Sequence, residues 1–317
     1  MKIVVVMKAL EKHREELKRV APKADFLYVP INEVQAEQIA DADIIIGNVP
    51  ANLLAGAHKL QWLQLNSAGT DAYIKPGVMP DGVKLTNATG AYGLALSEHM
   101  TAQLLAMMKK LYIYYDNQKE GKWQDEGKVK SIYGSKVLVV GMGDIGGEFA
   151  KRMKALGAQV TGIRRRVHEI PDYVDAMGEM ANLDSYLAEA DIVASSLPGT
   201  KATYHLFNEE RFNAMKKGSY FLNIGRGGAV DTDALVKTMK AGHLAGAALD
   251  VTEPEPLPKE HPLWKTPNVY ITPHISGDFH LDYTHDRIID IAAKNLELFL
   301  AGKPLKNEVD FSTGYKK

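Results

Sequence analysis

The stretch of this 317-residue chain that decides its fold is KVLVVGMGDIG, residues 136–146. Its apolar, β-branched first half predicts a buried strand, and residues 148–156 after it have the composition of a helix. Gly141, Gly143 and Gly146 permit a tight turn, close approach of the main chain to a pyrophosphate, and close helix packing. Since a helix N-terminus offers free N–H groups and positive potential, the stretch predicts a dinucleotide site. A methyltransferase or another tight αβ turn is the alternative.

The end of the next predicted strand indicates which dinucleotide is bound. This strand ends at Ile163, where a site for NAD would place Asp or Glu against the ribose hydroxyls, but Arg164, Arg165 and Arg166 follow instead. Guanidinium groups form charge-assisted bonds with a 2′-phosphate, which an acid would repel. The sequence therefore favours NADP over NAD, with Arg164 as the main contact. A solvated basic turn is the alternative.

Strand-like and helix-like segments alternate on both sides of this stretch, which predicts an α/β fold with parallel sheets. A long helix over residues 97–117, capped by Ser97 and Glu98, leads out of the first series, and a polar excursion follows over residues 118–134. The six strands of the second series predict a doubly wound sheet. The expected strands are residues 3–7, 26–29, 43–47 and 60–65, then 137–140, 159–163, 192–195, 219–224, 246–249 and 269–271, and a last helix spans 283–300.

Composition excludes several classes of protein. Hydrophobic residues make up 45% and charged residues 24% of the chain, and no apolar run reaches the ~20 residues of a membrane span. The 38 basic and 39 acidic residues are mixed along the chain, so no basic field for nucleic acid is expected. The chain has no cysteine, which excludes disulfides and cysteine metal sites and favours a cytoplasmic protein. The apolar run at residues 3–7 is too short for a signal peptide.

Three further segments concentrate polar residues directly after predicted strands, where open α/β sheets bind ligands. They are NIGRGG (residues 223–228), DVTEPEP (250–256) and TPHISG (272–277). Together with the glycine stretch and SSLPGT (195–200), they resemble the signature motifs of the D-2-hydroxyacid dehydrogenases, a similarity that extends over nearly the whole chain.

The resemblance implies a catalytic arginine, glutamate and histidine at Arg226, Glu255 and His274. An arginine can clamp the carboxylate of a 2-keto acid and polarise its carbonyl group, and a histidine can pass a proton near neutral pH. A carboxylate beside the histidine would orient the ring and stabilise its charged form. Glu253 is the local rival of Glu255 for this position. Formate dehydrogenases carry glutamine where Glu255 stands, so the glutamate favours hydroxyacid chemistry.

Further contacts with cofactor and substrate follow from the same resemblance. Asp250 matches the residue that holds the nicotinamide carboxamide. The turn NSAGTD (residues 66–71) can bind an anion through main-chain N–H groups, and the matching family loop holds the substrate carboxylate. Tyr92 and His99 match family patterns without an assigned role. Implied cofactor contacts are Gly141, Gly143, Asp144, Ile145, Gly146, Arg164, Arg165, Leu197, Pro198, Thr200, Ile224, Asp250 and His274, and implied substrate contacts are Ser67, Ala68, Gly69 and Arg226.

The family's organisation implies a flavodoxin-like α/β substrate domain, residues 1–95 with 287–317, and a Rossmann-type dinucleotide-binding domain, residues 96–286. A cleft between them that closes over the substrate, and a homodimer formed through the arm around Trp123, are further expectations. The regulatory domain of some phosphoglycerate dehydrogenases is expected to be missing, and no metal is expected. The resemblance also fits a dinucleotide-sensing corepressor, and it does not name the hydroxyacid.

Overall fold

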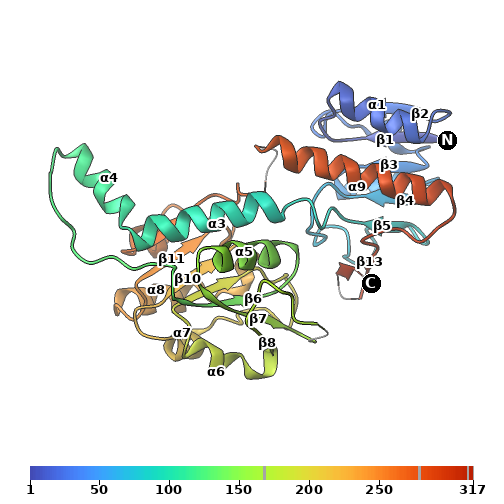
Figure 1. Cartoon of the computed structure of the whole chain (residues 1–317). Coiled ribbons are helices and arrows are strands. Elements are labelled where there is room, and N and C mark those ends of the chain that lie inside the picture. Colours follow the sequence, from blue (N-terminus) through green and yellow to red (C-terminus); the bar gives the residue numbers. More distant parts are fainter. Residues whose placement is uncertain (167–168, 278–279, 313, 317) are drawn as a thin grey trace. The chain divides into compact units, whose positions relative to one another are not determined.

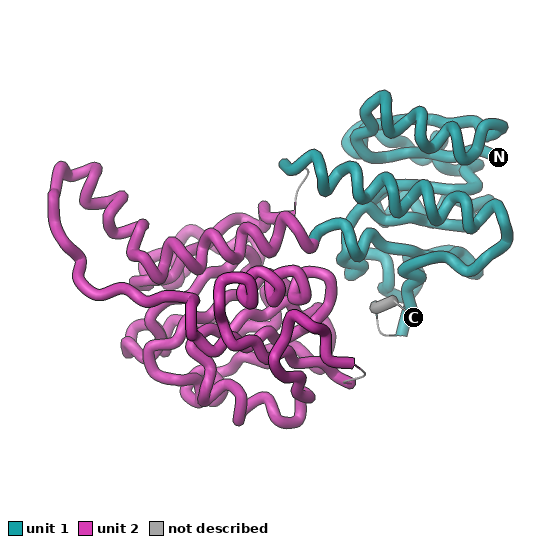
Figure 2. The backbone as a smooth tube through the Cα atoms, viewed as in Figure 1, with its two compact units in different colours: residues 1–92, 279–317 teal, residues 93–278 magenta. Residues whose placement is uncertain are grey.

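The computed structural model describes residues 1–166, 169–277, 280–312 and 314–316. The chain divides into two compact units, Met1–Tyr92 with Phe279–Lys317, and Gly93–Asp278 (Figure 2). The predicted divisions lie at 95/96 and 286/287. In the structure, the first division coincides with the start of helix α3 (Gly93–Met108), and all of helix α9 (Asp282–Leu300) belongs to the first unit.

Unit 1 is built on a parallel sheet in the order β2-β1-β3-β4-β5, the flavodoxin-like order. Its central strands are continuous buried apolar runs, as expected for a sheet covered on both faces. Strand β5 was not predicted, because its sequence KLT is not a run of apolar, β-branched residues. The elements are β1 (Lys2–Val5), α1 (Glu11–Val20), β2 (Asp25–Tyr28), α2 (Ala36–Ile39), β3 (Ile44–Ile46), η1 (Ala51–Gly56), β4 (Trp62–Gln64) and β5 (Lys84–Thr86).

Buried polar contacts explain why the end of the chain joins unit 1. Asn295 of α9 is fully buried, and its Nδ2 donates to Oε1 of Gln64 (2.8 Å). Its Oδ1 accepts from the N–H of Lys306 (2.7 Å), and Phe299 stacks on Trp62 at 5.5 Å between ring centroids. Since a buried amide left unpaired costs about 1–3 kcal/mol, these bonds favour one position of α9. A short pair, β13 (Val309–Asp310) and β14 (Tyr315–Lys316), follows.

Unit 2 contains a parallel seven-stranded sheet in the order β12-β11-β10-β9-β6-β7-β8, the doubly wound order with one strand added. Figure 1 labels β11, β10, β6, β7 and β8 of this sheet. The six predicted strands are all present. The seventh, edge strand β8, was missed because its sequence AMGE has no β-branched residue. The strands are β6 (Lys136–Val140), β7 (Gln159–Arg164), β8 (Ala176–Glu179), β9 (Ile192–Ser195), β10 (Tyr220–Asn223), β11 (Gly246–Leu249) and β12 (Val269–Ile271).

In unit 2, the long helix predicted over residues 97–117 differs from the observed one in its start and its continuity. It starts at Gly93, so Ser97 lies inside it and bonds back to the carbonyls of Gly93 and Leu94, and the predicted cap is wrong. It also breaks at Lys110, whose φ is 58°, before α4 (Leu111–Lys119). Elsewhere lie α5 (Asp144–Ala155), η2 (Met180–Asn182), α6 (Leu183–Leu187), α7 (Glu209–Ala214), η3 (Gly227–Ala229), α8 (Thr232–Lys240) and η4 (Pro262–Lys265). Within the described ranges, no helix is long and apolar enough to span a membrane.

Candidate active site

The predicted site segments of unit 2 follow neighbouring strands, and close main-chain contacts link them into one edge. The Ser196 hydroxyl donates to the carbonyl of Gly141 (2.6 Å). A Cβ added to Gly225 would lie 2.2 Å from the carbonyl oxygen of Leu197, and one added to Gly227 would lie 1.8 Å from that of Thr252. Glycine is therefore required at both positions, because no side chain fits between these loops.

The glycine stretch has the shape of a dinucleotide cradle. Gly141 has φ +101°, and a Cβ on Gly146 would lie 2.0 Å from the carbonyl oxygen of Gly141, so the turn and the start of α5 pack tightly. A Cβ on Gly143, by contrast, would meet no described atom within 4 Å, which leaves its main chain open to a ligand. The first turn of α5 also has N–H groups without intrahelical acceptors. These features fit a pyrophosphate.

Arg164 lies beside this cradle. It ends β7, and its Nε donates to the carbonyl of Met142 (2.9 Å), as does its Nη2. A guanidinium has five N–H donors, so donors remain after this contact. Arg165 and Arg166 are exposed. The half-buried Arg164 is thus the one of the three that the chain itself orients next to the glycine turn.

Arg226 is held by the turn that follows β10. The side chain of the fully buried Asn223 donates through Nδ2 to the carbonyl of Arg226 (2.9 Å). The guanidinium of Arg226 donates to the carbonyl of Gly225 (2.9 Å) and is partly exposed. No role was predicted for Asn223. Its place at the end of a predicted strand, in the same motif as Arg226, could have indicated that it supports the arginine.

Asp250 organises the loop that carries His274. It is 3% exposed, and its Oδ1 accepts from the hydroxyl of Thr272 (2.6 Å) and the N–H of Ile275 (3.2 Å). Its Oδ2 accepts from both the N–H and the hydroxyl of Ser276. Four hydrogen bonds match the acceptor capacity of a carboxylate. Asp250 therefore holds residues 272–276, whereas its implied contact with the cofactor stays a prediction.

His274 and Glu255 are paired. The Nδ1 of His274 donates to Oε1 of Glu255 at 2.6 Å, and the two side chains are 50% and 42% exposed. The N–H of His274 donates to the carbonyls of Asp250 (2.8 Å) and Thr272 (3.0 Å), which holds its backbone at φ 52°. Its Nε2 has no hydrogen-bond partner among the described residues. The ring is thus oriented on one side and open to a ligand on the other.

Glu253 takes a different partner. Its Oε2 lies 2.8 Å from Nε2 of His205, and its carbonyl accepts from the hydroxyl of Thr232 (2.8 Å). The geometry therefore brings Glu255, and not Glu253, to His274. No role was predicted for His205.

His99 and Gln103, one turn apart on α3, reach the same loop. The Nε2 of His99 lies 3.1 Å from the hydroxyl oxygen of Thr272 and 2.9 Å from Nε2 of Gln103, which itself donates to that hydroxyl (3.2 Å). The Nε2 of His99 is also 3.9 Å from Oδ1 of Asp250. His99 and Gln103 thus contact Thr272, two residues before His274 in the same loop. No role was predicted for Gln103 or Thr272. Gln103 lies one helical turn after His99, and Thr272 stands in the same motif as His274, so both positions offered a signal.

In unit 1, the turn of residues 66–70 follows β4. The Asn66 N–H and the Ser67 hydroxyl both reach Oδ1 of Asn48, and the hydroxyl of Tyr92 donates to the carbonyl of Asn66. The N–H groups of Ser67, Ala68 and Gly69 donate no hydrogen bond to any described residue. Fixed main-chain N–H groups of this kind can bind an anion.

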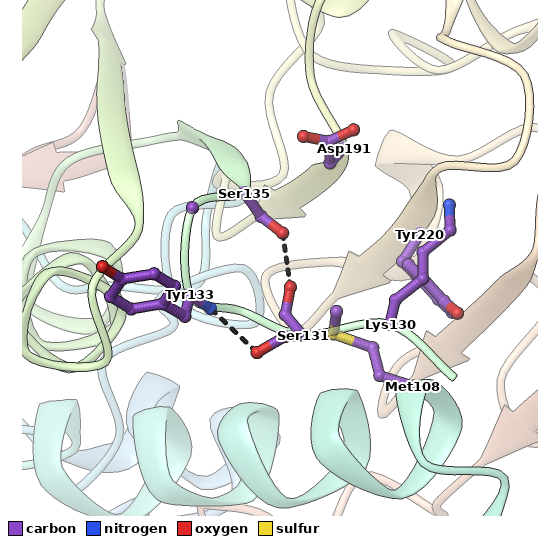
Figure 3. A pocket seen from close by; sticks show the side chains of 8 residues that line it. Met108, Lys130, Ser131, Tyr133, Ser135, Asp191 and Tyr220 are labelled. Atoms are coloured by element: carbon purple, nitrogen blue, oxygen red, sulfur yellow. Dashed lines mark hydrogen bonds between the residues drawn. The ribbon is translucent and has the colours of Figure 1, made fainter. Parts of the chain in front are cut away.

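A separate depression of about 250 Å³ lies at the opposite, amino-terminal edge of the unit 2 sheet (Figure 3). Both carboxylate oxygens of Asp191 there are paired, with Lys216 Nζ (2.7 Å) and the Lys136 N–H (2.9 Å). In the described residues no group of three or more His, Asp or Glu is placed to hold a metal. The depression is lined by Met108, Lys130, Ser131, Tyr133, Gly134, Ser135, Asp191 and Tyr220.

Comparison with known proteins supports the family that the motifs predict. A family model described as the NAD binding domain of D-isomer specific 2-hydroxyacid dehydrogenases matches residues 101–276. A glyoxylate reductase from Thermofilum pendens is 34% identical over 285 residues, 86% of this chain and 83% of that protein. This match contradicts the methyltransferase alternative.

Solved structures extend the similarity to the whole chain. A D-isomer specific 2-hydroxyacid dehydrogenase family protein from Aeromonas salmonicida is 33% identical with a TM-score of 0.88, covering 98% of this chain and 99% of that one. An NADPH-dependent glyoxylate/hydroxypyruvate reductase from Sinorhizobium meliloti, solved with NADP and sulfate, is 25% identical with a TM-score of 0.84 and 99% coverage of both chains.

Proposed function

From the premise that this chain belongs to the D-isomer specific 2-hydroxyacid dehydrogenase family and is an NAD(P)-dependent oxidoreductase, we propose that it reduces small 2-keto acids with NADPH. The observation that carries this proposal is the hydrogen bond of 2.6 Å between His274 Nδ1 and Glu255 Oε1. It leaves Nε2 of an oriented imidazole available for a proton transfer. Such a group is what carbonyl reduction requires.

Each residue of the site has a distinct role in this proposal. The cofactor, when bound, supplies a hydride to the carbonyl carbon. Arg226 binds the substrate carboxylate and polarises the carbonyl bond. His274 then delivers the proton from Nε2 to the carbonyl oxygen, so that the carbonyl becomes a hydroxyl. Glu255 stabilises the imidazolium before this transfer and keeps the ring in place.

The cradle, with Gly141, Gly143, Asp144, Ile145 and Gly146, would hold the pyrophosphate, and Leu197, Pro198, Thr200 and Ile224 would line the rest of the cofactor site. The contact of Arg164 with Met142 supports NADP over NAD, because it keeps a guanidinium beside the turn where the ribose phosphate is expected. Arg165, from the same basic turn, would add charge. The NADP in the Sinorhizobium meliloti reductase is consistent with this preference.

In unit 1, the N–H groups of Ser67, Ala68 and Gly69 would offer main-chain donors to a substrate carboxylate. Glyoxylate and hydroxypyruvate are the proposed substrates, because a glyoxylate reductase and a glyoxylate/hydroxypyruvate reductase are among the similar proteins. We further propose a cytoplasmic homodimer that uses the exposed residues around Trp123. Static light scattering tests the dimer, which a monomeric mass would contradict.

The test of the reaction is NADPH oxidation followed by absorbance with glyoxylate, hydroxypyruvate, pyruvate and longer 2-keto acids. Turnover is expected with the short acids and should fall with chain length. His274→Gln, which keeps a polar side chain but no titratable proton, should bind NADPH normally and lose about 10²–10⁴-fold in kcat. Tight NADPH binding by the wild type without turnover of any acid would contradict the proposal, as would full activity of His274→Gln.

A further inference from the structure

His205 connects two of the loops that carry the proposed catalytic residues. Its main-chain N–H donates to the carbonyl of Gly228 (2.7 Å), in the turn that begins with Arg226. Its ring Nε2 lies 2.8 Å from Oε2 of Glu253, in the segment that carries Glu255. One residue therefore binds both segments, by main chain on one side and by side chain on the other.

The position of His205 is itself fixed. Its φ of 46° lies in the left-handed region, which is uncommon for residues other than glycine. The ring of Tyr204 stacks on the imidazole, with 4.1 Å between the centroids and 12° between the planes. The preceding turn is closed by Thr203, whose hydroxyl donates to the carbonyl of Pro198. These contacts orient the His205 ring toward Glu253, although the two side chains are 36% and 38% exposed.

The position of the segment that carries Glu255 depends on contacts made by Glu253. Glu253 is tied twice, through its carboxylate to His205 and through its carbonyl to the hydroxyl of Thr232 (2.8 Å). Glu255, two residues later, is 42% exposed, and the hydrogen bond recorded for its carboxylate goes to His274. Since this side chain has little packing of its own, its reach toward His274 depends on where Glu253 holds the main chain.

We propose that His205 is a positioning residue: through Glu253 it holds the main chain of residues 252–256 so that the Glu255 carboxylate meets His274. This inference rests on the proposed role of Glu255. In this proposal His205 acts through Glu253 and not by contact with the substrate or the cofactor. Losing the bond to Glu253 lets the segment move, and a misplacement of about 1 Å in a catalytic group can cost about 10²-fold in rate.

Two substitutions distinguish the effect of the hydrogen bond to Glu253 from that of the backbone conformation of His205. In His205→Gln the amide nitrogen occupies nearly the position of Nε2 and can still donate to Glu253. His205→Asn tolerates the positive φ better but is too short to reach Glu253. We expect kcat to fall about 10- to 100-fold in His205→Asn and about threefold or less in His205→Gln, with the NADPH dissociation constant unchanged in both.

Two further measurements make the proposal falsifiable. In the background of Glu255→Gln, His205→Asn should have no additional effect on kcat, because both changes remove the same interaction. Multiplying effects would overturn the proposal. Hydrogen exchange of peptides covering residues 252–257 should be faster in His205→Asn than in the wild type or His205→Gln, and equal exchange would also overturn it.

The matched control is His243→Asn. The ring of His243 binds the carbonyl of Met215 (2.8 Å), near the amino-terminal edge of the same sheet, and this change should leave residues 252–257 and kcat unaffected. A change of the same size in this variant would overturn the assignment to His205. If the wild type reduces no 2-keto acid, the proposed function fails, but hydrogen exchange still decides whether His205 holds the segment.

Discussion

The Nδ1 atom of His274 lies 2.6 Å from Oε1 of Glu255, although the two residues are 19 positions apart in the chain. Glu255 follows β11 and His274 follows β12, and these strands pair in parallel with Leu249 opposite Ile271. The register of one strand pair therefore places both residues at the same edge. The local bonds of Asp250 then orient the loop of His274 toward its partner.

Glu255→Gln should lower kcat by about 10- to 100-fold, part of the full contribution of an acid–base group. The amide keeps the shape of the side chain but removes the negative charge that stabilises the imidazolium. Steady-state kinetics with the best 2-keto acid provide the measurement, and Glu260→Gln, at an exposed residue of the same connection, is the control. Equal kcat in the two variants would refute the role of Glu255.

Arg226→Lys should lower kcat/KM by about 10²-fold or more, although the positive charge is kept. A lysine cannot form the bidentate contact with a carboxylate that the planar guanidinium allows. KM for the keto acid should rise and kcat should fall, while NADPH binding measured by fluorescence stays constant. The exposed Arg19→Lys in α1 is the control, and wild-type kinetics in Arg226→Lys would exclude a substrate contact.

Arg164→Ser should weaken NADPH binding by about 10- to 100-fold, the value of one or two charge-assisted hydrogen bonds, with little effect on NADH. Isothermal titration with each cofactor measures both constants. Arg166→Ser, at an exposed residue of the same turn, should change the ratio much less. Equal losses for NADPH and NADH would instead show that Arg164 acts only through its bond to Met142.

His285 predicts a pH dependence of stability in unit 1. Burial lowers the pKa of this histidine, whose Nε2 donates to the carbonyl of Lys8 (2.6 Å). Folding therefore favours the neutral ring, so this stabilisation is complete above the unfolded pKa of about 6.5 and is lost as the pH falls below it. The thermal midpoint should fall less between about pH 7.5 and about pH 5.5 in His285→Gln than in the wild type.

The control for this prediction is His58→Gln, because His58 is exposed. Its thermal midpoint should follow that of the wild type at both pH values. An equal drop in the wild type and in His285→Gln would show that protonation of His285 does not contribute to the acid sensitivity.

The sequence predicted most of the parallel strands because buried strands are short runs of apolar, β-branched residues. It missed β5 and β8, whose sequences KLT and AMGE show no such run and pair only because neighbouring strands offer an edge. It also predicted one helix where Lys110 breaks the chain into two. Helical periodicity continues across this break, so the pattern of side chains could not reveal it.

At the site, glycines at close approaches of the chain and the resemblance of three motifs after buried strands predicted the segments that carry the proposed chemistry, with Arg226, Glu255 and His274 as their main residues. That Glu255 faces His274 while Glu253 faces His205 became known from the folded chain. The two glutamates are two residues apart in one segment and have the same chemistry. Their partners come from loops distant in the chain, so sheet register and packing decide between them, and local sequence does not encode that distinction.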